Sequence, residues 1–302
     1  MNKAMSRFVG FVILATRTPL TQTARLVTKL DTMFEHPPIA VHYDFSQCSR
    51  AECEGWVAAF PKNVWLVQAG VVTQWARFGV VEATIHALDQ MYRSGDGPEW
   101  WTSMSGSDYP IKPAARILRD LEESPYDAHM DHERIYYGMT TYPWQDCHGR
   151  YCGIHFRVPF LSRRLRPVMR EFTIEHPWLT RPFVPFSKTL ECYSGEAWMS
   201  GRRKTAEYIL EFHRTHPAFA GHYRKVLAPD ESYFQTILGN AQQMKLSKDH
   251  FRYIDWPPYA HNPKVLTMED LPAIKLSGAH FARKFDLKVD ASVLDELDML
   301  TR

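Results

Sequence analysis

The apolar run from Phe8 to Leu14 constrains the fold more than any other feature of the sequence. These residues, FVGFVIL, carry no polar or charged side chain. A continuous run of this kind is typical of a strand that is covered on both faces. It is too short for a membrane span, which needs ~20 residues, and it lacks the small-residue cleavage site of a signal peptide. We therefore predict a central strand of a buried sheet.

Helix-like and strand-like segments alternate after this run. Helical periodicity covers 20–34 and 79–92, and short apolar segments predict strands at 39–43, 64–67 and 100–104. This alternation predicts βαβ units and a mostly parallel sheet flanked by helices, the α/β fold class. The polar segment 122–158 has no clear assignment. Beyond it we expect a basic helix over 161–171, extended chain over 188–198, helices over 202–212 and 229–239, a strand over 251–255, and a terminal helix over 286–300. No linker or repeat appears, so we expect a single domain over 1–302.

Composition and charge narrow the class of protein. The chain is 45% hydrophobic and 23% charged, as in ordinary globular proteins, and its net charge of +2 argues against a nucleic-acid-binding protein. The odd count of 5 cysteines predicts reduced thiols and a cytoplasmic setting. Two Cys-x4-Cys pairs, the second beside His148 and His155, leave zinc as a minor alternative, because structural zinc sites usually use tighter pairs.

Two acids follow predicted strands. Asp44 comes after the strand at 39–43, and Asp108 lies in the turn after the strand at 100–104. Ligands of open α/β sheets bind beyond the carboxyl ends of the strands, where such carboxylates accept hydrogen bonds from a ribose or a base. The alternative is that each acid caps a loop or the following helix.

No Asp-x-Asp pair occurs in the chain, although many nucleotide-sugar enzymes hold a metal with one. The nearest imitation is Asp131-His132-Glu133, which His129 precedes. Carboxylates and imidazoles bind divalent ions, but a solvated surface loop is the favoured interpretation here. We therefore predict no metal site and no metal cofactor.

Four blocks of the sequence resemble the core-2/I-branching glycosyltransferase family, which includes β-1,6-N-acetylglucosaminyltransferases and peptide O-xylosyltransferases. Their order and spacing also fit, so the resemblance covers nearly the whole chain. The blocks are WTSMSGSDYPIK at 101–112, YSGEAW at 193–198, PDESYFQTIL at 229–238 and SGAHFARKFD at 277–286. The resemblance implies a GT-A-type fold and an inverting, metal-independent transfer from a UDP-sugar.

The resemblance also assigns the two chemical tasks of such a transfer. Glu231 matches the family's catalytic base, which takes the proton of the acceptor hydroxyl. Arg283 and Lys284 match the pair that holds the departing diphosphate. From the sequence alone, Glu231 is equally well explained as a first-turn acid favoured by the helix dipole, and the cationic pair as a solvated surface feature.

Further residues are assigned to the substrates with open alternatives. By the resemblance Asp44 contacts the nucleoside, and Asp108 either binds the donor or holds its turn. Trp198 stacks on an acceptor sugar or belongs to the core, and Asp230 is placed on the acceptor side. Glu196 departs from the family pattern, which has Ser at this position, so the acceptor contacts there are open.

The sequence therefore predicts a glycosyltransferase that moves GlcNAc or xylose from a UDP-sugar to a hydroxyl and forms a β-linkage. Residues 1–120 would bind the donor, and 121–302 would hold the acceptor and the catalytic base. The alternative is a non-catalytic nucleotide-sugar- or glycan-binding protein of the same fold. A glycoside hydrolase is disfavoured, because adjacent Asp230 and Glu231 do not flank one bond. The chain shows no membrane anchor of the kind that secretory family members carry, which leaves peripheral membrane association open.

Overall fold

The computed structural model describes residues 7–15, 18–44, 49–68, 71–161, 167–258, 260 and 262–302. Its centre is a seven-stranded sheet in the order β12-β6-β11-β4-β1-β2-β3. The strands are β1 (Val9–Ala15), β2 (Ile39–Tyr43), β3 (Val64–Leu66), β4 (Trp100–Ser105), β6 (Ala128–Met130), β11 (Met199–Arg202) and β12 (Leu246–Ser247). Among them β11 alone runs antiparallel to its neighbours. The predicted α/β fold with a mostly parallel sheet is confirmed.

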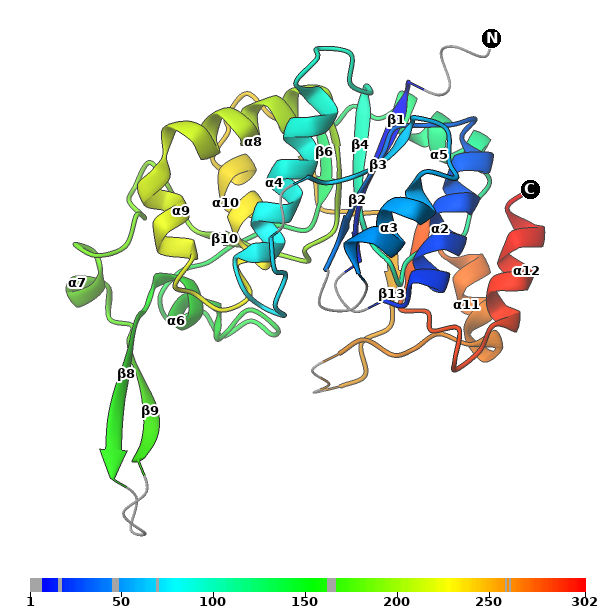
Figure 1. The fold of residues 1–302 in the computed structure, drawn as a ribbon. Helices are drawn as coiled ribbons and strands as arrows, with labels where there is room; N and C mark the ends of the chain where they lie inside the picture. The colour runs from blue at the N-terminus through cyan, green and yellow to red at the C-terminus, as the bar shows by residue number, and fades with distance from the viewer. Residues whose placement is uncertain are drawn as a thin grey trace.

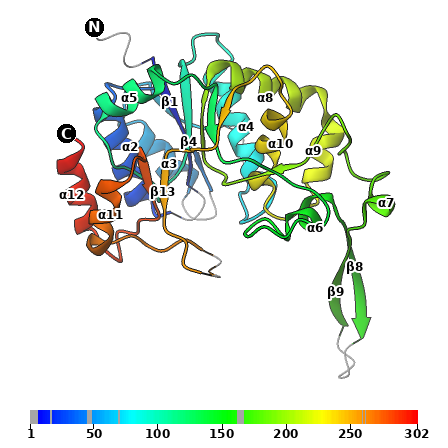
Figure 2. The ribbon, with the colours of Figure 1, turned by 180° about the vertical axis from the view of Figure 1, so that it is seen from behind.

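Strand β1 is buried along its whole length because helices cover both faces of the sheet. Its side chains alternate: Phe11 and Ile13 belong to one apolar core, and Val12 and Leu14 to the other. Figures 1 and 2 show the two helical layers. The first core lies under α2 (Leu20–Met33), α5 (Ala114–Glu122), α11 (Leu271–Leu276) and α12 (Ser292–Leu300). The second lies under α4 (Gly79–Tyr92), α8 (Arg203–Thr215), α9 (Pro217–Tyr223) and α10 (Tyr233–Gly239).

A smaller sheet brings the end of the chain to the central one. It has three strands in the order β13-β14-β5, with β13 (Arg252–Ile254), β14 (Phe281–Arg283) and β5 (Tyr109–Pro110). Strand β14 pairs antiparallel with β5, and Ala282 is opposite Tyr109. This register places Arg283 beside the turn that follows β4. A two-stranded ribbon joins β7 (Glu133–Arg134) to β10 (Tyr193–Ser194).

The helix expected over 161–171 is wrong. The chain there forms an antiparallel hairpin of β8 (Ile154–Leu161) and β9 (Pro167–Ile174), which projects from the body in Figure 1. Residues 162–166 lie outside the described part of the chain. Pro167 cannot donate the backbone hydrogen bond that a helix interior requires, and it is tolerated at the first residue of a strand. The basic residues of this segment are compatible with both a helix and a strand, so they do not distinguish the expected helix from the hairpin.

Most other expected elements are present, with two local differences. The helix expected over 229–239 is divided into a 3-10 turn, η1 (Pro229–Glu231), and α10, which begins at Tyr233. The unassigned middle segment contains α6 (Cys147–Cys152), and the short helices α3 (Arg50–Val57) and α7 (Pro177–Thr180) were not expected. No helix in the described ranges is both long and apolar enough to span a membrane.

Candidate active site

A cleft opens at the carboxyl ends of β1 and β4. It consists of two adjoining cavities of about 440 and 310 Å³. Leu14, Thr18, Ser105 and Ser107 line the smaller one, so it lies at the strand ends where ligands of α/β sheets are expected. The two cavities share a wall, and we treat them as one cleft. The shared residues are Trp75, Ala76, Glu196, Ala228, Glu231 and Trp256.

Backbone contacts fix Glu231 in this shared wall. Its carbonyl oxygen accepts hydrogen bonds from the Gly195 N–H at 2.8 Å and from the Ser194 hydroxyl at 2.9 Å. These bonds tie η1 to the chain just after β10. Gly195 is required for this approach, because a Cβ at this position would lie 2.0 Å from the carbonyl oxygen of Asp131.

The Glu231 carboxylate is paired with Arg150 of α6. The Arg150 Nη1 donates to Glu231 Oε2 at 3.0 Å. The carboxylate lies in a cleft surrounded by protein, although 43% of the side chain remains exposed to the cleft. Burial, and then the charge of Asp230, raise the pKa of Glu231 to about 7, against the opposing effect of Arg150. At neutral pH a large fraction of Glu231 is therefore ionised, and this carboxylate is a stronger base than that of an ordinary glutamate.

Two more acids share the cleft with Glu231. Burial raises the pKa of Asp230 to about 6, and its Oδ1 atom has no hydrogen-bond partner among the described residues. Glu196 lines both cavities, and its Oε1 accepts a hydrogen bond from the Trp256 indole N–H at 3.0 Å. Burial also raises the pKa of Glu196. The acids destabilise one another's charged forms, which favours proton uptake in this cleft.

Arg283 lines the smaller cavity and is held by an acid and an aromatic ring. Its Nε donates to Asp108 Oδ1 at 3.1 Å, and its guanidinium carbon lies 4.4 Å from the centre of the Trp198 ring. The Arg283 side chain is 14% exposed, and that of Asp108 is fully buried. Lys284 also lines this cavity and has no ion-pair partner in the described part of the chain. Arg283 and Lys284, predicted for the donor, therefore line the same cavity as Trp198 and Asp230, which were predicted for the acceptor side.

Asp108 and Asp44 take different positions from the other expected site residues. Asp108 does not line the cleft: besides Arg283, its carboxylate accepts hydrogen bonds from the Ser105 hydroxyl at 2.5 Å and the Ser105 N–H at 3.2 Å. It therefore holds both its own turn and Arg283. Asp44 is buried at the end of β2 and accepts a hydrogen bond from the Thr73 hydroxyl at 3.4 Å. Direct contact of either acid with a donor stays a prediction.

The residues considered for metal binding are dispersed. Within the described ranges, no group of three or more His, Cys, Asp or Glu side chains is arranged to hold a metal ion. His129 bonds to the Ser124 hydroxyl at 2.7 Å, and His155 to the Arg150 carbonyl at 3.1 Å. Cys48, a member of the first Cys-x4-Cys pair, lies outside the described residues. Metal independence itself remains a prediction.

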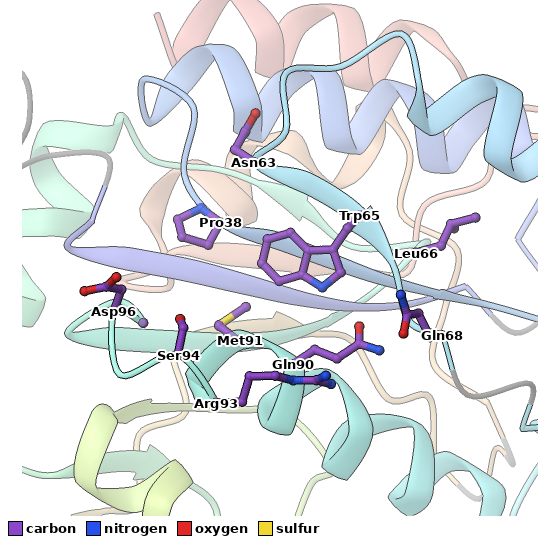
Figure 3. A pocket seen from close by; sticks show the side chains of 11 residues that line it. Pro38, Asn63, Trp65, Leu66, Gln68, Gln90, Met91, Arg93, Ser94 and Asp96 are labelled. Carbon is purple, nitrogen blue, oxygen red and sulfur yellow. The ribbon is translucent and has the colours of Figure 1, made fainter.

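A further cavity, of about 430 Å³, lies beside β3, the edge strand of the seven-stranded sheet. Figure 3 shows the Trp65 indole of β3 beside Pro38, with Met91, Gln90 and Arg93 on the facing side. Its lining contains one acid, Asp96, and one cation, Arg93. It has no counterpart of the paired Glu231 or of the Arg283–Lys284 cations. The cleft is therefore the candidate active site.

The sequence patterns do not identify Arg150, or the cleft residues Trp75 and Trp256, as parts of the site. Arg150 lies 81 positions from Glu231 in the chain, in a segment without clear periodicity. Trp75 and Trp256 lie in segments without a recognisable motif. The unassigned segment is rich in His, Tyr and Asp, but this composition does not identify a contact.

Comparison with known proteins agrees with the sequence motifs. The family model described as "Core-2/I-Branching enzyme" matches residues 9–275. Two Arabidopsis thaliana proteins, beta-glucuronosyltransferases GlcAT14A and GlcAT14B, are each 27% identical, over 278 and 272 residues. The matches cover 85% of this chain but only 56% and 58% of those proteins, so the chain spans somewhat over half their length. Among solved structures, a 4-diphosphocytidyl-2C-methyl-D-erythritol synthase from Anaerococcus prevotii aligns with a TM-score of 0.41 and 10% identity, covering 91% of this chain and 98% of that one.

Proposed function

The chain belongs to the core-2/I-branching enzyme family, and we propose that it is an inverting glycosyltransferase that uses a UDP-sugar. The observation that carries the proposal is the pairing, within one cleft, of a carboxylate titrating near neutrality with two cations. Glu231 has a pKa of about 7, and Arg283 and Lys284 line the adjoining cavity. A single displacement at the anomeric carbon needs a base on one side and a stabilised leaving group on the other.

Glu231 is proposed as the base. Its ionised form would accept the proton of the acceptor hydroxyl while that oxygen attacks the anomeric carbon. A pKa near the working pH is favourable for this step, since it balances the ionised fraction against proton affinity. Arg150 would hold the carboxylate in one orientation and stabilise the fraction that is charged. Such positioned proton transfer typically contributes on the order of 100- to 10,000-fold in rate.

Arg283 and Lys284 are proposed to bind the diphosphate of the donor. Asp108 and Trp198 restrict the guanidinium to one position, so it need not reorganise when negative charge builds on the leaving oxygen. The lysine ammonium is a mobile point charge that adjusts to the phosphate. Their positive charges would act where other nucleotide-sugar enzymes use a divalent ion, and we therefore propose activity without a metal.

The cleft also suggests how the substrates divide the space. The smaller cavity, with its cations and strand ends, is proposed for the donor. The larger cavity carries Tyr142, Trp144 and Trp256 and is proposed for the acceptor, because sugar C–H faces pack well on aromatic rings. Glu231 lies on the shared wall, where an acceptor hydroxyl would meet the donor. The halves 1–120 and 121–302 remain proposals, and the proposed donor contact of Arg283 in β14 would extend the donor side beyond the first half.

Two observations bear on the identity of the donor sugar, and they point to different sugars. The sequence motifs resemble GlcNAc and xylose transferases, whereas the curated relatives are named beta-glucuronosyltransferases. Glucuronate therefore joins GlcNAc and xylose as a candidate donor sugar. A non-catalytic sugar-binding protein would gain nothing from a cleft carboxylate with a near-neutral pKa, and this favours the enzyme.

Thermal-shift titration with UDP, UDP-GlcNAc, UDP-xylose and UDP-glucuronate tests the donor assignment, because a ligand that binds the folded state raises Tm. We expect UDP and at least one UDP-sugar to raise Tm in the presence of EDTA. Arg283→Ala should abolish the shift, whereas Arg119→Ala, an exposed cation away from the cleft, should retain it. Equal shifts in wild type and Arg283→Ala would refute the diphosphate site.

A further inference from the structure

A separate cavity of about 300 Å³ lies on the other side of α6 from the cleft. Helix α6 divides the two spaces: Cys147 and Arg150 line the cleft, whereas His148 and Cys152 line this cavity. The loop after α7 forms much of the remaining wall. The polar and aromatic lining residues are Arg134, Tyr136, His148, Arg181, Phe186 and Lys188.

The cavity has an excess of positive charge. Arg181 and Lys188 are exposed, and neither has an ion-pair partner in the described ranges. Arg134 is paired with Glu191 at 2.5 Å, and Glu191 is the one acid among the described lining residues. Two cations at this cavity are therefore available to an anionic ligand. A second acid, Glu175, is exposed and does not belong to the lining.

A buried imidazole in the wall lacks a hydrogen-bond partner. His148 is 8% exposed, and its Nδ1 atom has no partner among the described residues. Burial lowers the pKa of His148, so its ring is neutral near pH 7 and carries one donor and one acceptor nitrogen. Buried polar atoms are usually satisfied by protein, water or ligand. The His148 ring therefore contributes an unsatisfied polar group to the wall of this cavity.

We propose that this cavity binds a carboxylate-bearing saccharide, at a site separate from the cleft. Arg181 and Lys188 would contact the carboxylate, and His148 a hydroxyl. The apolar faces of Tyr136, Phe186 and Pro177 suit sugar C–H surfaces and would be left unused by a bare anion. The volume is that of a small-molecule site and exceeds the needs of a single inorganic anion. The inference rests on the cavity's own residues and does not depend on the proposed glycosyl transfer.

Isothermal titration with trigalacturonate tests the proposal, with maltotriose as the uncharged trisaccharide and inorganic phosphate as the bare anion. We expect trigalacturonate to bind and Arg181→Ala/Lys188→Ala to weaken it at least about 10-fold, since each charged hydrogen bond accounts for roughly this factor. Both side chains are exposed, so the double variant should fold normally. Arg119→Ala/Lys62→Ala removes the same charges at exposed positions elsewhere and should bind like wild type.

Because the cleft also contains cations, variants of the cleft and of this cavity distinguish binding at the two sites. Arg283→Ala should leave trigalacturonate binding unchanged, and Arg181→Ala/Lys188→Ala should leave the UDP-induced rise in Tm unchanged. Three results would overturn the proposal: unaltered trigalacturonate binding in Arg181→Ala/Lys188→Ala, equal binding of maltotriose, or loss of trigalacturonate binding in Arg283→Ala. Binding of phosphate with an affinity equal to that of trigalacturonate would reduce the site to a bare-anion site and also overturn it.

Discussion

Glu231 and Arg150 form the ion pair on which the proposed chemistry depends. The pair does not hold the carboxylate fully ionised, because burial and Asp230 outweigh the attraction of the guanidinium and leave the pKa of Glu231 at about 7. A base with this pKa should show itself in the pH dependence of the reaction. We expect kcat/KM to fall as the pH decreases through about 7, since the protonated acid cannot accept a proton. An acid limb near pH 4.5, the ordinary range of a glutamate, would contradict the assignment.

The same elevated pKa predicts an effect on stability. The folded protein binds the Glu231 proton more tightly than the unfolded chain does. The contribution of this group to folding is therefore full below the unfolded pKa and is lost as the pH rises through about 7. Glu231→Gln should raise Tm relative to wild type more at pH 8 than at pH 5. Glu211→Gln is the control, because its side chain is 58% exposed in α8, and it should show no such pH-dependent difference.

Asp108 accepts a hydrogen bond from Arg283 and does not itself line the cleft. Asp108→Asn keeps the size of the side chain and removes the charge that the Arg283 Nε contacts at 3.1 Å. We expect weaker UDP binding with a folded protein, measured by titration calorimetry, and an effect smaller than that of Arg283→Ala. In Arg283→Ala, loss of one charged contact to the leaving group should cost ~3 kcal/mol in transition-state stabilisation. If Asp108→Asn also weakens UDP binding in the Arg283→Ala background, Asp108 acts directly on the donor.

At the scale of elements, Gly195 joins β10 to η1 and so positions Glu231. A Cβ here would lie 2.0 Å from the Asp131 carbonyl oxygen, which is backbone and cannot rotate away. Gly195→Ala should therefore lower stability by about 1–3 kcal/mol, as overpacked sites do, and reduce activity by displacing Glu231. Gly221→Ala in α9 is the matched control, because nothing lies within 4 Å of its Cβ position. The control should be neutral or stabilise by ~0.4–1 kcal/mol in denaturant unfolding.

Sequence patterns predicted the elements whose periodicity reflects burial. The strand at 39–43 and the helix at 79–92 agree with β2 and α4 to the residue, because burial sets their patterns: α4 packs one face in a core, and β2 is buried between the two cores. The segment 161–171 shows where this reasoning stops. Strand pairing in the β8–β9 hairpin depends on residues up to 20 positions apart, such as Ile154 and Ile174, and Arg-rich sequence alone has no period that distinguishes it from a helix.

The candidate site was predictable in part for a related reason. Residues inside recognisable motifs, such as Glu231 and Arg283, could be assigned by resemblance. Arg150 could not, because its role exists only once α6 is packed against η1. Asp108 was predicted as a site residue. Its contact with Arg283, however, depends on the pairing of β14 with β5, two segments about 170 residues apart in the sequence. Contacts between distant segments of this kind are not encoded in local patterns.

At the scale of the whole molecule, the cleft draws on both ends of the chain. Strand ends of β1 and β4 contribute to the wall, β14 and the residue after it supply Arg283 and Lys284, and η1 supplies Glu231, the proposed base. We therefore predict that donor binding stabilises the entire chain and not one half of it. Hydrogen exchange with and without saturating UDP should show protection at the ends of β1 and β4 and at β14 together. Protection confined to residues before 120 would contradict a donor site that includes Arg283.

Release of UDP from the best-bound UDP-sugar, in the presence of EDTA and an acceptor panel, tests the central claim most directly. We predict that wild-type protein releases UDP at an unchanged rate in EDTA. Glu231→Gln should release it about 100- to 10,000-fold more slowly while still binding UDP. Glu211→Gln should match wild type. Undiminished turnover by Glu231→Gln, or a requirement for added Mg²⁺ or Mn²⁺, would contradict the proposed metal-independent transfer with Glu231 as base.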